Sequence, residues 1–267
     1  MNDDATTADR WDPDRYHRFR AERRRPFDDL VRHLRPIPGG RLVDLGCGTG
    51  ELTADAAVAL GATAAVGLDA SPSMLGRTDE VRAPGVELAF RRGDLATFEE
   101  PDAWDVVIAS ASLHWVPDHE DVLARWRRSL RPGGQLAVQV PANPDHPSHT
   151  TIDEVLAEPP FAELVPDPPA DPLHHVLDPA RYAEVLFDLG AADPLVRLQV
   201  YGMALASTAE VVEWTSGTAL TRVRRVLDDD AYERFVERYR TRLLEHLGDR
   251  RPYYYAFKRI LVVATFD

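Results

Sequence analysis

Short apolar runs alternate with longer amphipathic stretches along most of the chain. Apolar runs of this length predict buried strands, and the amphipathic stretches between them predict helices. The expected strands are Arg41–Leu45, Thr63–Leu68, Val86–Phe90, Trp104–Ala109, Gln135–Val140, Leu195–Ala204 and Arg259–Thr265. Such alternation favours an α/β fold built on a doubly wound, seven-stranded and mostly parallel sheet.

Residues that typically start helices support this pattern. Ser71-Pro72 and Asp178-Pro179 each combine a favourable N-cap residue with a proline at the first helical position. The expected helices are Glu51–Leu60, a short one from Pro72, Asp118–Leu130, Asp178–Leu189, Ser207–Leu220 and Asp228–Leu247. Between Pro141 and Pro172 the chain is rich in proline, which predicts an irregular connection or lid instead of regular core.

A glycine loop follows the first predicted strand. Gly46, Gly48 and Gly50 have the spacing G-x-G-x-G, whereas a dinucleotide-binding loop has the spacing G-x-G-x-x-G. Glu51 directly follows the third glycine, and a carboxylate at this helix start is a poor neighbour for a pyrophosphate. The loop therefore predicts a nucleoside-type cofactor without a pyrophosphate.

Two aspartates end the next two strands. Asp69 lies about 20 residues after the glycines, which is the spacing at which an acidic residue accepts hydrogen bonds from ribose hydroxyls. Asp94 could accept from an adenine amino group, with Leu95 against the ring; alternatively, both aspartates only cap helices. Together with the glycines they predict S-adenosylmethionine. Further residues expected to bind it are Asp44, Cys47, Ala70, Met74, Ser110 and Trp115.

Net charge and cysteine content limit the classes of binding partner and the cellular location to be expected. A formal net charge of −13 argues against a general nucleic-acid binder, because phosphate contacts need a basic surface. No apolar run approaches the roughly 20 residues of a membrane span, and the single cysteine excludes internal disulfides. We therefore expect a cytoplasmic protein with a small-molecule substrate. The histidines between Asp145 and His175 are too irregularly spaced to predict a metal site.

Several segments resemble known enzymes. Val43–Gly50, Gly67–Ser71 and Leu130–Gly134 resemble the motifs of class I methyltransferases, which have a Rossmann-like fold. A narrower resemblance, to trans-aconitate 2-methyltransferases, covers nearly the whole chain. It is carried by Trp11-Asp12-Pro13, Tyr16, Phe19, Glu22-Arg23, Arg25-Pro26, Ala111–His119, Leu136–Asn143 and His149. It implies methyl transfer to a carboxylate of a small tricarboxylic acid, giving a monomethyl ester.

The resemblance also implies a division of the chain and a substrate site. Residues 1–36 would form an N-terminal helical lid, and residues 37–267 the cofactor-binding domain, with substrate-cap insertions at about 141–177 and 207–255. Catalytic roles are expected for His114, Arg23 and Arg25. The residues expected to bind substrate are Tyr16, Arg23, Arg25, His114, His149, Trp214 and Arg222. Arginines are natural partners of carboxylates, although charge-rich helix faces are often only solvated.

Three hypotheses remain open from the sequence. An ionised carboxylate acceptor needs no general base, whereas a hydroxyl or amine acceptor would use His114 or His149 as the base. A third possibility is a cofactor-binding scaffold that has lost catalysis. The chain departs from the family pattern in Glu213–Leu220 and in the proline-rich stretch Pro159–His175. Both lie in the predicted cap, so these departures concern the identity of the acceptor.

Overall fold

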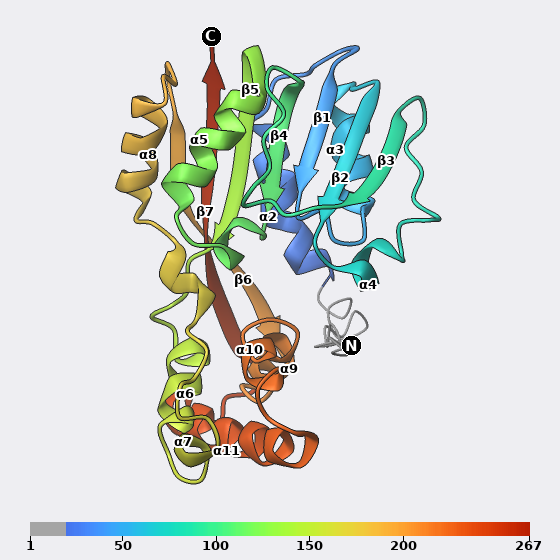
Figure 1. The fold of residues 1–267 in the computed structure, drawn as a ribbon. Helices are drawn as coiled ribbons and strands as arrows, with labels where there is room; N and C mark the ends of the chain where they lie inside the picture. Colours follow the sequence, from blue (N-terminus) through green and yellow to red (C-terminus); the bar gives the residue numbers. More distant parts are fainter. Residues whose placement is uncertain (1–19) are drawn as a thin grey trace, which may run out of the picture. The chain divides into compact units, whose positions relative to one another are not determined.

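The computed structural model describes residues 20–267, and within them it has a sheet of seven strands flanked by helices (Figure 1). The strands are β1 (Arg41–Leu45), β2 (Ala64–Asp69), β3 (Glu87–Arg92), β4 (Trp104–Ser110), β5 (Leu130–Pro141), β6 (Leu195–Leu205) and β7 (Tyr253–Phe266). Their order is β3-β2-β1-β4-β5-β7-β6. Strands β1 to β5 pair in parallel and β7 pairs antiparallel to β5, which confirms the predicted mostly parallel, doubly wound sheet.

Helices and short helical turns connect the strands. They are α2 (Arg20–Arg32), α3 (Glu51–Leu60), α4 (Pro72–Leu75), η1 (Leu113–Trp115), α5 (His119–Ser129), α6 (Pro147–Leu156), α7 (Phe161–Leu164), η2 (Pro172–His175), α8 (Pro179–Asp188), α9 (Glu210–Ser216), α10 (Thr221–Arg224) and α11 (Asp229–Leu247). None of the helices within residues 20–267 has the length and apolar character to cross a membrane.

The chain divides into two compact units. The first contains residues 20–23, 143–174 and 200–257 of the described chain, and the second contains residues 24–142, 175–199 and 258–267. Strands β6 and β7 have residues in both units. The segments of the first unit have bounds close to the predicted insertions at about 141–177 and 207–255.

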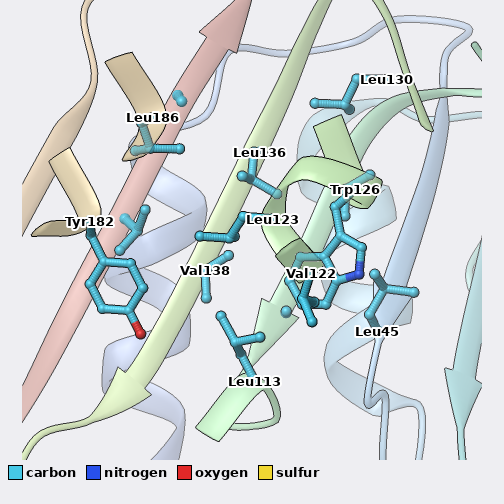
Figure 2. Close-up of a cluster of buried hydrophobic side chains, with 14 of the residues drawn as sticks. Leu45, Leu113, Val122, Leu123, Trp126, Leu130, Leu136, Val138, Tyr182 and Leu186 are labelled. Atoms are coloured by element: carbon cyan, nitrogen blue, oxygen red, sulfur yellow. The ribbon is translucent and has the colours of Figure 1, made fainter. Parts of the chain in front are cut away.

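The second unit has a core on each face of its sheet. On one face, α5 and α8 pack against β4, β5 and β7; Figure 2 shows Leu123 and Trp126 of α5 and Tyr182 of α8 beside Leu136 and Val138 of β5. On the other face, α2 and α3 pack against the alternate residues of the strands. Two-sided burial is the reason that these strands are continuous apolar runs in the sequence.

Helix α2 occupies the second half of the predicted N-terminal lid. Phe27 and Leu30 are buried in the cluster that α2 forms with α3 and the sheet, and Leu34 follows them. Residues 24–36 therefore pack as part of the α/β unit. The first half of the predicted lid lies outside the described residues.

The first unit has a core of its own, which corrects one prediction. The segment Pro141–Pro172 is not an irregular connection: it contains α6 and α7, and Ile152 and Val155 are fully buried. Helix α6 lies against α11, and the rings of Phe161 and Phe235 meet edge to face, with centroids 5.2 Å apart. Pro147, one of the prolines that suggested irregular structure, is at the start of α6, where a missing N–H costs nothing.

Smaller differences concern element ends. The helix predicted over Ser207–Leu220 is limited to α9, and the strand predicted over Arg259–Thr265 extends from Tyr253 to Phe266. Tertiary pairing, which lengthens strands beyond their apolar centre, is not visible in local patterns.

Candidate functional site

The glycine loop between β1 and α3 is packed on one side and open on the other. The backbone N–H groups of Gly46 and Cys47 both donate to the carbonyl of Leu68, at 2.7 and 3.1 Å. A Cβ atom on Gly46 would lie 2.2 Å from the Cβ of Ser112, whereas one on Gly48 would meet nothing within 4 Å. The loop therefore has free space in front of Gly48, where a ligand can approach the backbone.

Asp69, at the end of β2, holds this loop. Its Oδ2 accepts from the backbone N–H of Gly48 at 2.8 Å, and its Oδ1 accepts from that of Ser71 at 2.9 Å. The carboxylate is half-buried, and an ionised carboxylate has about four acceptor positions. Two of them remain for ribose hydroxyls, so the turn-capping role and the predicted cofactor role are compatible.

Asp44, at the carboxyl end of β1, is a buried acid. Its Oδ2 accepts from the Thr53 hydroxyl at 2.6 Å, while its Oδ1 is buried without a partner among the described residues. Burial raises the pKa of Asp44 to about 7. The hydrogen bond from Thr53 lowers this pKa, and the nearby charge of Asp69 raises it further. An unsatisfied buried carboxylate oxygen beside an open glycine loop fits a ligand that brings a cationic donor.

The other predicted cofactor residues follow β2 and β3 or lie in the loop. Asp94 is exposed, and its Oδ1 accepts from Ala96 N–H at 2.9 Å, which leaves Oδ2 for a ligand. Leu95 is half-buried, and its carbonyl accepts from the Trp126 indole at 2.9 Å.

The remaining predicted cofactor residues lie after β2 or in the glycine loop. Ala70 is exposed, Met74 is half-buried and Gly50 caps α3 with φ 83°. Cys47 is buried, and burial raises the pKa of its thiol, so it fills space instead of acting as a nucleophile.

The end of β4 brings polar and aromatic residues to the same edge of the sheet. Ser112 donates to the Leu45 carbonyl at 2.5 Å, and this bond joins β1 to the segment after β4. In η1, His114 is buried and Trp115 is exposed, with ring centroids 4.9 Å apart. Carboxyl ends of parallel strands are where ligands bind in doubly wound folds.

Gln139 of β5 is a residue that the sequence analysis missed. It pairs in register with Ser110, its Nε2 donates to the Ser110 hydroxyl at 3.2 Å, and its Oε1 is buried without a partner among residues 20–267. The signal was present, because a glutamine inside the aliphatic run Leu136–Val140 implies a buried amide in need of partners.

The predicted substrate residues of the first unit have diverse surroundings. His149 pairs with Asp171, with 2.8 Å between Nδ1 and Oδ2. Trp214 is buried against the rings of Tyr255 and Phe257. The guanidinium of Arg222 is buried and already bonded within the unit, so a role as a free substrate clamp is less favoured than a structural one.

The N-terminal predictions are only partly located. Tyr16 and the side chain of Arg23 lie outside the described residues, and Arg25 is exposed on α2. Within the described chain, no group of three or more His, Cys, Asp or Glu side chains is arranged to hold a metal ion.

Comparison with known proteins agrees with this geometry. The family model described as "Methyltransferase domain" matches residues 42–134, which run from β1 into β5. A trans-aconitate 2-methyltransferase of Deinococcus radiodurans is 42% identical over 260 residues, or 96% of this chain and 98% of the relative.

Solved structures support the fold. The YcgJ protein of Bacillus subtilis has a TM-score of 0.57 at 16% identity, covering 90% of this chain and 97% of that one. A phosphoethanolamine N-methyltransferase 2 of Haemonchus contortus, in complex with S-adenosylhomocysteine, has a TM-score of 0.52 at 18% identity, covering 90% and 52%. The match to the methyltransferase family model and the 42% identity to a curated methyltransferase confirm the predicted enzyme class and its cofactor. The chain belongs to the trans-aconitate 2-methyltransferase family, within the class I S-adenosylmethionine-dependent methyltransferases.

Proposed function

We propose that this enzyme transfers a methyl group from S-adenosylmethionine to a carboxylate of trans-aconitate, or of a similar small di- or tricarboxylic acid, giving a monomethyl ester. The observation that carries the proposal is the 42% identity to a trans-aconitate 2-methyltransferase over 98% of that relative. Because the likeness covers the first unit as well as the α/β unit, it includes the segments predicted to contact the acceptor.

The residues at the strand ends fit the cofactor. Asp69 would accept from the ribose hydroxyls and Asp94 from the adenine amino group. Oδ1 of Asp44, which has no partner within residues 20–267, would accept from the ammonium of the methionine part. The open side of Gly48 would let the cofactor approach the backbone. When bound, S-adenosylmethionine supplies an electrophilic methyl group, which the acceptor attacks directly.

Positioning is then the main task of the protein. An acid substrate is already ionised at neutral pH, so no residue has to remove a proton from it. Holding acceptor and methyl group in line can contribute on the order of 7–11 kcal/mol. We assign this task to His114 beside the strand ends, and to Tyr16, Arg23, Arg25 and His149.

A small-molecule acid as partner, without nucleic acid or membrane, is part of the same proposal. It is supported by the net charge of −13. We also propose a cytoplasmic location, which the single cysteine favours.

The decisive experiment is methyl transfer from radiolabelled S-adenosylmethionine to trans-aconitate, cis-aconitate, citrate and isocitrate. We expect label in a volatile methyl ester, with trans-aconitate well above the other acids. Binding of the cofactor without transfer to any acid would reject the proposal. It would direct the search to hydroxyl and amine acceptors, for which the buried His114 is a candidate base.

An Asp69→Asn variant tests the cofactor site. An amide keeps one acceptor oxygen, so either Gly48 or Ser71 loses its carboxylate acceptor and the ribose loses a charged partner. Hydrogen bonds to charged groups contribute about 1.5–3 kcal/mol. The variant should therefore bind S-adenosylmethionine with a dissociation constant roughly ten- to hundredfold higher than that of the wild type. Titration calorimetry measures it. Asp79→Asn, at an exposed position after α4, is the control and should bind as the wild type does.

A further inference from the structure

A buried carboxylate holds His149 in the first unit. His149 is the third residue of α6, and its Nδ1 lies 2.8 Å from Oδ2 of Asp171. Asp171 is 3% exposed, and its Oδ1 accepts from the backbone N–H of Leu173 at 2.9 Å. Burial alone would raise the pKa of Asp171, but the hydrogen bond and charge of His149, with the bond from Leu173, lower it to about 2. Asp171 is therefore ionised at neutral pH.

A second pair completes the cluster. Arg222 of α10 donates from Nη2 to Oδ1 of Asp153 at 2.5 Å and from Nη1 to the Pro169 carbonyl. Its charge also helps to lower the pKa of Asp171. Asp153 follows His149 by one turn of α6, so both lie on the same helix face. We call His149, Asp171, Arg222 and Asp153 the His149 cluster, and all four residues lie within the first unit.

The His149 cluster fixes the orientation of the imidazole. An ionised carboxylate can only accept, so Nδ1 of the imidazole must carry a hydrogen and donate it to Asp171. No described residue forms a hydrogen bond with Nε2, and the side chain keeps 14% of its surface exposed. Nε2 is therefore the ring atom presented to a ligand.

Charge balance indicates the kind of ligand. Apart from His149, the cluster holds two carboxylates and one guanidinium, which is one excess negative charge. An imidazole with a hydrogen on each nitrogen balances that charge and can donate its Nε2–H to an anion. By contrast, the surface pair of His246 with Glu154 leaves both side chains 38% exposed, where such pairs contribute little.

The charge of Arg222 favours the ionised form of Asp171. We propose that Asp171 is a positioning residue that holds His149 so that Nε2 binds a carboxylate of the acid substrate other than the one that is methylated. This inference rests on the proposed function. It explains why a partly exposed histidine has a buried acid as its partner, an arrangement that orients ligand-binding imidazoles in other proteins.

The first test is steady-state kinetics of the full chain with the preferred acid. Asp171→Asn and His149→Gln should each raise KM for the acid roughly tenfold, the loss of one charged hydrogen bond, with kcat and KM for S-adenosylmethionine within about twofold. The double variant should equal the single variants, since one interaction is lost in all three. His246→Gln, in the exposed pair, is the matched control and should leave every constant unchanged.

The second test does not depend on turnover. In ¹⁵N NMR spectra of the imidazoles, with His149→Gln as the assignment control, trans-aconitate should shift the His149 ring signals of the wild type and not those of Asp171→Asn. An unshifted His149 in the wild type would overturn the inference. So would an unchanged KM in His149→Gln, which stays informative if Asp171→Asn does not fold. Absence of methyl transfer in the wild type rejects the proposed function instead, and a signal shift there would still support acid binding at His149.

Discussion

A Gly46→Ala variant is expected to lose measurable S-adenosylmethionine binding and to melt well below the wild type. Gly46 has φ 83°, a conformation that costs residues with a Cβ roughly 1–2 kcal/mol. The new Cβ would also lie 2.2 Å from the Cβ of Ser112. Ser112 cannot yield freely, because its hydroxyl is bonded to the Leu45 carbonyl at 2.5 Å.

The combined cost of the Gly46→Ala change is about 2–5 kcal/mol of unfolding free energy, from the strained backbone and the overpacked contact. Thermal melting and titration calorimetry measure the two effects. Gly85→Ala separates them, because Gly85 has φ 76° and a Cβ there meets nothing within 4 Å. It should show only the backbone cost and bind the cofactor normally. Equal melting temperatures of the two variants would contradict the role of the Ser112 contact.

The α/β unit was predictable because the residues that start and end its helices and strands form local sequence patterns. Strand β1 and helix α3 have the predicted bounds, since the glycine loop ends the one and starts the other. Asp69 could be located from spacing alone, because the chain must return to the same edge of the sheet after one helix.

The first unit was not predictable in the same way. Its helix α6 begins in a proline-rich stretch, and Pro147 starts the helix instead of preventing it. Helix α6 packs against α11, which lies far away in the sequence. Tertiary burial of this kind is not expressed in local composition.

The partners of the candidate site residues show the same limit. His149 was predicted, but Asp171, 22 positions away, was not. Arg222 was predicted as a substrate clamp, and the structure pairs it with Asp153, 69 positions away. Residue type indicates what a side chain can bind, whereas the fold decides whether that capacity is already used.

An Asp44→Asn variant should be more stable than the wild type without ligand and should bind the cofactor less tightly. Because burial raises the pKa of Asp44 to about 7 from 3.8, its contribution to stability is full below pH 3.8 and is lost as the pH rises through 7. At pH 8 the ionised group costs at most about 4 kcal/mol. An asparagine avoids this cost but buries an amide N–H₂ without an acceptor, so a net gain of about 1–3 kcal/mol is expected.

Melting curves of the ligand-free protein between pH 4 and pH 8 measure the stability effect of Asp44→Asn. The wild type should lose stability over this range relative to the variant, whereas Asp79→Asn, at its exposed position, should follow the wild type. Cofactor binding should change in the opposite sense, because the ammonium group of S-adenosylmethionine loses its anionic acceptor, and a dissociation constant at least about tenfold weaker is expected. Parallel curves for wild type and variant would mean that folding does not raise the pKa of Asp44, which would contradict this prediction. A buried acid that lowers the stability of the ligand-free protein but raises its affinity for the cofactor is expected where a residue serves binding at the expense of stability.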